Sequence, residues 1–159
     1  MSMAALPAFS SSSVAFEKLK TLEGKWEGTV QWSGARTETG KMNAVYSLTG
    51  NGSAVVEDLI SEEGKRIMTS VYHMDGDTLR MTHYCGTGNQ PRFKAMDDHE
   101  EGQRISFEMV DITNMTKPDA PHVNGAEITF KTEKEFTLSF SFISGDKKSA
   151  ELIQLHRIE

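Results

Sequence analysis

The chain has 159 residues and a formal net charge of −6, with 37% hydrophobic and 25% charged residues. This length suits one domain, and no apolar run approaches the roughly 20 residues that a membrane-spanning helix needs. Because Lys and Arg form no dense cluster to offset the negative balance, a nucleic-acid partner is not expected. The single cysteine, Cys85, excludes an intrachain disulfide and a thiolate zinc cage.

The N-terminal segment 1–13 is rich in Ser and Ala, and it lacks the basic start and the apolar stretch of an intact signal peptide. We expect 1–13 to be a flexible tail and 14–159 to be a single domain. The compartment is left open, as cytoplasmic or, if this segment is a trimmed export signal, periplasmic. Apolar residues from Val14 to Leu22, behind serines that can cap, predict a short helix that Gly24 ends.

After Gly24, apolar and polar residues alternate with a period of two almost to the end, as in strands with one buried face. Short polar links separate the segments, and Asp75-Gly76 is the strongest hairpin signal, because such turns take positive φ at both central residues. The expected strands cover about Trp26–Trp32, Thr39–Leu48, Ser53–Ser61, Arg66–Met74, Thr78–Cys85, Arg92–Met96, Arg104–Val110, Ala126–Lys131, Phe136–Ile143 and Ser149–Arg157.

A long antiparallel meander without helices over its edges closes most simply on itself, because closure leaves no unpaired edge groups. The sequence therefore predicts an all-β fold: an up-and-down antiparallel β-barrel of about ten strands behind a short N-terminal helix. Barrels of eight strands are filled by side chains or hold one small ligand, so about ten strands should leave a cavity. The alternative is an interior filled by Phe and Met side chains.

Alternation also predicts which side chains point into the barrel. With Asp75-Gly76 as a two-residue turn, Tyr72 pairs with Leu79 and Met68 with His83. The inward face of this hairpin then carries Met68, Ser70, Tyr72, Leu79, Met81, His83 and Cys85. Elsewhere the inward set is Trp26, Val30, Trp32, Ile105, Phe107, Met109, Ile128, Phe130, Phe136, Leu138, Phe140 and Phe142.

An apolar cavity with a few convergent polar atoms is the usual form of a small-molecule site. His83 is the main candidate, because an imidazole in such a cavity can ligate a metal or haem, or hydrogen-bond a ligand. The alternative is a buried neutral ring with a partner on a neighbouring strand. His83 and Cys85 alone are too few ligands for zinc, so we predict no metal site.

Two further polar residues belong to the candidate site. We expect Arg92 at the rim, where its guanidinium can clamp a polar head group, and His122 in a lid formed by the long segment Asp111–Gly125. The predicted ligand-contacting set is His83, Tyr72, Met81, Trp32, Phe107, Met109, Phe140, Arg92 and His122.

Gly24-Lys25-Trp26, after a short helix and at the start of the first strand, resembles the Gly-x-Trp pattern of the calycins, which include lipocalins and fatty-acid-binding proteins. Arg157 stands where that group packs an Arg over the Trp, which implies a structural role for Gly24, Trp26 and Arg157. Thr82-His83-Tyr84-Cys85 and Gly88-Asn89-Gln90-Pro91 resemble an uncharacterised lipocalin-like family of bacterial proteins, from about Phe16 to the C-terminus.

The resemblance implies a calycin-like barrel that binds a small hydrophobic or amphipathic molecule, as a carrier or sensor. Nitrobindin-like haem barrels share the Gly-x-Trp opening, so haem is one alternative, although the surroundings of His122 and His156 do not reproduce their haem-ligand context. Another alternative is a small barrel enzyme, an isomerase, cyclase or hydratase, with His83 as general base and Tyr72 or Glu57 as its partner. A structural role through a homodimer is a further alternative.

Overall fold

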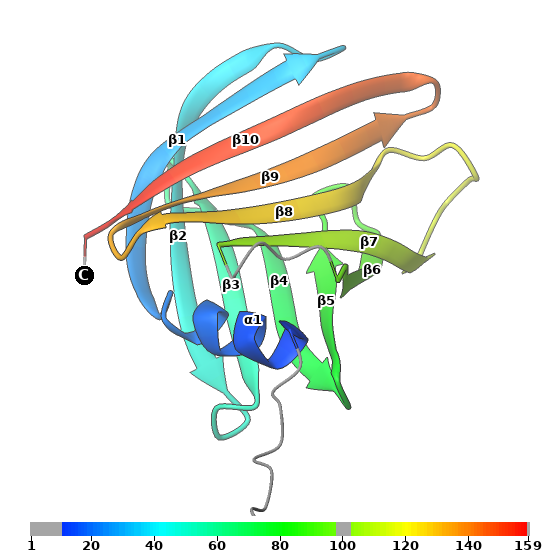
Figure 1. The fold of residues 1–159 in the computed structure, drawn as a ribbon. Coiled ribbons are helices and arrows are strands. Elements are labelled where there is room, and N and C mark those ends of the chain that lie inside the picture. The colour runs from blue at the N-terminus through cyan, green and yellow to red at the C-terminus, as the bar shows by residue number, and fades with distance from the viewer. Residues whose placement is uncertain (1–10, 98–102, 159) are drawn as a thin grey trace, which may run out of the picture.

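The structure, a computed structural model, describes residues 11–97 and 103–158. One helix, α1 (Ser11–Lys20), precedes ten strands that form a closed barrel (Figure 1). The strands are β1 (Gly24–Gly34), β2 (Glu38–Thr49), β3 (Ala54–Ser61), β4 (Arg66–Asp75), β5 (Thr78–Tyr84), β6 (Gln90–Ala95), β7 (Arg104–Thr113), β8 (His122–Thr132), β9 (Glu135–Ser144) and β10 (Lys147–Arg157).

Each strand pairs antiparallel with its neighbours in the chain, and β10 pairs with β1 to close the barrel. The predicted fold class is therefore confirmed. β8 begins at His122, four residues before the predicted start, and β7 continues to Thr113, so strand pairing takes up much of the expected long loop.

The N-terminal helix begins at Ser11 instead of near Val14, and residues 1–10 of the expected tail lie outside the described residues. At ten residues, α1 is too short to cross a membrane, and it is the single helix in the described part of the chain.

The β4–β5 hairpin has a different register from the predicted one. Gly76 and Asp77 form the turn, Tyr72 pairs with Met81, and Ser70 pairs with His83. Of the two turn residues only Gly76 has a positive φ, 59°, so the turn is not the type I′ form, which needs a positive φ at both central residues. The register differs by an even number of residues, so the same side chains still point inward. Those fully buried are Ser70, Tyr72, Leu79, Met81 and His83.

One end of the barrel is closed by α1 and the start of β1 (Figure 1). The Trp26 indole nitrogen donates a hydrogen bond to the Leu22 carbonyl oxygen at 2.7 Å, and the ring packs edge-on against Phe136. The Arg157 guanidinium carbon lies 4.4 Å from the Trp26 ring centroid, and this group also donates to the carbonyl oxygens of Thr21 and Glu23. This is the packing that the Gly-x-Trp resemblance implies, and it fastens β10 to the helix end.

From this closed end to beyond its middle, the barrel is filled by side chains. The fully buried residues include Tyr46, Tyr72, Met81, Phe93, Phe136, Leu138 and Phe140. Aromatic rings make contact across this interior, as Tyr72 does with Phe107 and Trp26 with Phe136. The expectation that Phe and Met side chains fill the interior therefore holds for this part of the barrel.

Met109 departs from the predicted inward set, because its side chain is 36% exposed. β7 pairs with β8 only as far as Glu108 and then continues beside β6 alone. Phe93 pairs with Met109 and Arg92 with Asp111, so Val110 is an extra residue in β7. This bulge lies beyond Met109, which still pairs with the buried Phe93. Met109 is exposed because β8 no longer pairs with β7 past Glu108.

Candidate functional site

A cavity of about 480 Å³ opens at the barrel end opposite α1. Its wall is formed by residues near the ends of β1, β3 and β9, residues in the first halves of β2, β4, β8 and β10, and residues 85–87 after β5. The apolar part of the lining consists of Val30, Trp32, Met42, Ile67, Met68, Val123 and Phe142. On β9, Phe140 lies one inward step deeper than Phe142 and is fully buried, so the cavity ends on top of the packed interior.

Of the predicted ligand-contacting residues, Trp32 alone lines this cavity. His83, Tyr72, Met81, Phe107 and Phe140 do face inward as expected, but they lie deeper and pack against one another or their neighbours. The alternation of the strands identifies an inward residue, and it does not indicate its depth along the barrel axis.

Charged side chains surround the mouth of the cavity. The Arg36 guanidinium lies 4.1 Å from the Trp32 ring centroid and pairs with Glu38 at 2.7 Å. Lys41 pairs with Glu62 at 3.3 Å. The side chains of these pairs are half exposed or more, so each pair contributes little to stability. They do place charged groups of both signs at the entrance of the cavity.

Glu151 is the charged group inside the cavity wall. It lies on β10 between Trp32 of β1 and Phe140 of β9, and its side chain is buried. Burial raises the pKa of this carboxyl to about 7, although the Arg36 charge acts in the opposite direction. Glu151 is not among the predicted site residues, yet its inward position follows from alternation, since it shares a face of β10 with the buried Ile153 and Leu155.

A row of polar residues crosses four adjacent strands below the cavity. Register places Tyr46, Glu57, Ser70 and His83 side by side on β2, β3, β4 and β5. The hydroxyls of Tyr46 and Tyr72 both donate to Glu57 Oε2, at 2.7 and 2.6 Å. Burial raises the pKa of Glu57, while the two tyrosine hydrogen bonds act to lower it.

His83 has the surroundings of a buried neutral ring. Its Nδ1 lies 2.9 Å from Ser70 Oγ, and its ring packs against Phe140 with centroids 4.8 Å apart. Burial lowers its pKa to about 4, so the imidazole is neutral at pH 7. A general base works best with a pKa near the working pH and in reach of the substrate. His83 has neither property, since it is fully buried and does not line the cavity.

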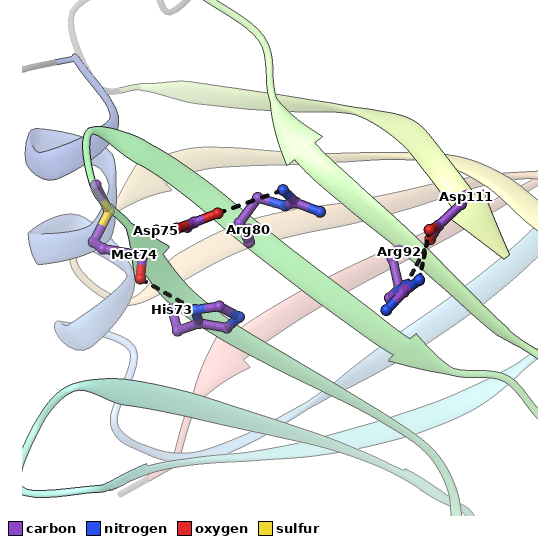
Figure 2. Close-up of polar contacts among 6 residues, drawn as sticks. All are labelled: His73, Met74, Asp75, Arg80, Arg92 and Asp111. Carbon is purple, nitrogen blue, oxygen red and sulfur yellow. Dashed lines mark hydrogen bonds and ion pairs between the residues drawn. The ribbon is translucent and has the colours of Figure 1, made fainter. Parts of the chain in front are cut away.

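Arg92 does not lie at the rim. It sits on the outer face of β6, between the buried Pro91 and Phe93, and binds both carboxylate oxygens of Asp111 on β7, at 2.6 and 2.5 Å. Figure 2 shows this pair together with the Arg80–Asp75 pair on the neighbouring strands. The expectation that Arg92 contacts the head group of a ligand at the rim is therefore wrong, because the Arg92 side chain points out of the barrel.

His122 also does not cover the cavity. Its Nδ1 donates to the Ala120 carbonyl oxygen at 2.8 Å, and the cavity is lined by its neighbour Val123 instead. The loop before β8 is fastened to the β5–β6 connection by Asn89, whose side-chain amide donates to the Pro121 carbonyl oxygen at 2.9 Å. Within the expected lid Asp111–Gly125, Val123 is the only residue that lines the cavity.

The cavity offers sulfur donors and no imidazole. Met42, Met68 and Cys85 line it, but none of the described histidines does. These residues do not fit a histidine-ligated haem. In the described ranges 11–97 and 103–158, no three His, Cys, Asp or Glu side chains are grouped so as to hold a metal ion.

No family model and no curated protein matches the sequence. Among solved structures, Rv2717c from M. tuberculosis is similar with a TM-score of 0.62 and 14% identity, over 91% of this chain and 98% of that chain. A protein of unknown function from the DUF3598 family of Nostoc punctiforme is similar with a TM-score of 0.60 and 11% identity, over 88% of this chain and 49% of that chain. At these identities the likeness shows the fold alone. The protein is thus a closed ten-stranded barrel similar in fold to both.

Proposed function

We propose that this protein is a lipocalin-like barrel of the calycin type that binds one small amphipathic molecule, as a carrier or sensor, in the cavity opposite α1. The observation that carries the proposal is the cavity: about 480 Å³, lined by apolar side chains together with charged and polar ones, above an interior that is otherwise packed. Small-molecule sites commonly have volumes of roughly 300–1,000 Å³.

The calycin assignment is supported by the arrangement at the closed end. The glycine and tryptophan of the Gly-x-Trp pattern open β1, and Arg157 near the end of β10 packs over Trp26. In this proposal the closed end is structural. The open end carries the function.

The ligand-contacting residues follow from the lining of the cavity. Trp32, Met68 and Phe142 contact the apolar body of the ligand, and Met42 and Val123 complete the wall. Glu151 and Arg36 are the polar groups within reach of its head. The aromatic residues deeper in the barrel support this floor and do not touch the ligand.

The test is a fluorescence titration with prodan, a neutral naphthalene dye whose emission shifts in apolar surroundings. We expect saturable binding of one dye per chain and a blue shift. Val123→Trp places an indole in the cavity and should abolish binding, whereas His122→Trp, at the adjacent residue that does not line the cavity, should leave it unchanged.

Circular dichroism and a thermal melt establish that each variant is folded, and Met68→Trp provides a second blocking variant if Val123→Trp does not fold. Absence of saturable binding to the wild-type protein contradicts the proposal. So does equal binding by a folded blocking variant and the wild type, because the dye would then occupy another surface.

A further inference from the structure

Acidic residues outnumber basic ones around the cavity. The lining contains Glu38, Glu62, Glu63 and Glu151 against Arg36 and Lys41. Both basic groups are already paired, Arg36 with Glu38 and Lys41 with Glu62. In the described part of the chain this leaves Glu63 and Glu151 without an ion-pair partner. A site lined by one sign of charge concentrates ligands of the opposite sign.

Glu151 is the more unusual of the two, because it is 2% exposed and no described residue makes a hydrogen bond or ion pair with it. A buried carboxyl normally has a hydrogen-bond or charge partner, since burying it alone is costly. Its cross-strand neighbours, Trp32 and Phe140, supply none near its head. The carboxyl is instead part of the wall of a hollow space that a ligand can enter.

Few other titratable groups face Glu151. From the β1–β2 connection and the start of β2 come Arg36, Glu38 and Lys41, and β9 contributes only Phe142 to the cavity. Across the mouth lie Glu62 and Glu63 of the β3–β4 turn and Cys85 after β5. Among them, the Arg36 charge acts to lower the pKa of Glu151, but burial outweighs it.

The Trp32 ring adds a second feature that favours a positive charge. An indole face attracts cations, and here it holds the Arg36 guanidinium. The Arg36 side chain is 50% exposed and is anchored by Glu38, so a ligand cation can take its place over the ring without breaking a buried contact. An anionic head group would need the Arg36 guanidinium as its partner. That group already donates to Glu38 Oε2 from two nitrogen atoms, at 3.1 and 2.7 Å.

We propose that the ligand is an organic cation, with a flat apolar body held by Trp32 and Phe142 and an ammonium or amidinium group paired with the Glu151 carboxylate. This inference rests on the proposed function and specifies the chemical class of the ligand. Ligand binding then supplies the partner that Glu151 lacks within the chain.

Three naphthalene probes of similar shape and different charge test the inference by isothermal titration calorimetry at pH 8. They are 2-naphthylmethyl-trimethylammonium, 2-naphthylmethanol and 2-naphthylacetate. We expect the cation to bind at least tenfold more tightly than the alcohol and the anion to bind most weakly. Glu151→Gln should remove the tenfold preference, so that the cation binds no more tightly than the alcohol, whereas Glu63→Gln, at the mouth, should keep most of it.

The wild-type protein gives a second readout that needs no variant. Because the trimethylammonium charge does not titrate, its affinity should fall about tenfold between pH 8 and pH 6 as Glu151 becomes protonated. The alcohol should show no such loss. In Glu151→Gln the affinity of the cation should not depend on pH over this range.

Equal affinities for the three probes, or tightest binding of the anion, overturn the inference and leave the proposed function in place. A pH-independent affinity of the cation for the wild-type protein also overturns it. If the proposed function itself is wrong, prodan also fails to bind. This result separates failure of the proposed function from failure of the inference about ligand charge.

Discussion

Two buried glutamates of this barrel differ in how their carboxyl groups are satisfied. Glu57 receives hydrogen bonds from two phenol hydroxyls, those of Tyr46 and Tyr72. Glu151 receives none from the described residues and lies in the cavity wall. Hydrogen bonds to a charged group are worth roughly 1.5–3 kcal/mol each. Glu57 is therefore held by its neighbours, whereas in our proposal a ligand supplies the partner of Glu151.

The stability of the protein should depend on pH through Glu151. Its pKa is raised from 4.5 to about 7 by folding, so the folded state holds the proton more tightly. The group therefore stabilises the fold below about pH 4.5, and this contribution is lost as the pH rises to about 7. Each pKa unit corresponds to about 1.4 kcal/mol, which gives a loss on the order of 2.5 kcal/mol between pH 5 and pH 8.

Urea denaturation of the wild-type protein and Glu151→Gln at pH 5 and pH 8 measures this effect. The variant lacks the titrating group, so its free energy of unfolding relative to the wild type should rise by about 2.5 kcal/mol from pH 5 to pH 8. Glu57, whose pKa is also raised, is present in both proteins and cancels in the difference. A constant difference across this range would exclude a neutral buried carboxyl at position 151.

At the scale of elements, the sequence pattern predicts strands and faces well and predicts register and depth poorly. The inward set of the β4–β5 hairpin is correct although its turn is Gly76-Asp77, because an even shift preserves the face. Met109 pairs with the buried Phe93 but is 36% exposed, because β7 is no longer paired with β8 beyond Glu108, and no local sequence pattern reveals this. Arg92 was predicted to be the first residue of its strand and so to lie at the rim. β6 in fact begins two residues earlier, at Gln90, and Arg92 is an outward-facing residue within it.

The pairing of β1 with β10 depends on a glycine that allows the two backbones to approach closely. A Cβ atom added at Gly28 would lie 1.7 Å from the Gln154 carbonyl oxygen, which belongs to the partner backbone and cannot move without breaking the pairing. Gly28→Ala should therefore lower the free energy of unfolding by on the order of 3 kcal/mol or more.

Gly40→Ala is the matched control, because a Cβ atom there would meet only Val30 Cγ1, at the ordinary contact distance of 3.6 Å. This change in β2 should be within about 1 kcal/mol of the wild type or slightly stabilising. Urea midpoints of the two variants provide the comparison. Equal midpoints would mean that β1 and β10 are farther apart than described.

At the scale of the whole molecule, the barrel and its inward residues follow from the sequence, but the position of the cavity does not. Where hollow space remains depends on the register of every strand and on the summed side-chain volume at each level of the barrel. Large residues such as Phe93, Phe136 and Phe140 fill the closed end and the middle. Trp32 lines the cavity because it is the last inward residue of β1, and Glu151 could have been found from the same alternation on β10.

The most direct test of a ligand site at the open end uses Cys85, the only cysteine in the chain, which is partly exposed in the cavity wall. Its rate of alkylation by iodoacetamide, followed by intact-protein mass spectrometry, would be measured with and without saturating prodan. If the dye occupies this cavity, it covers the thiol and alkylation should slow at least severalfold. An unchanged rate with dye bound would place the dye outside the cavity and contradict the account.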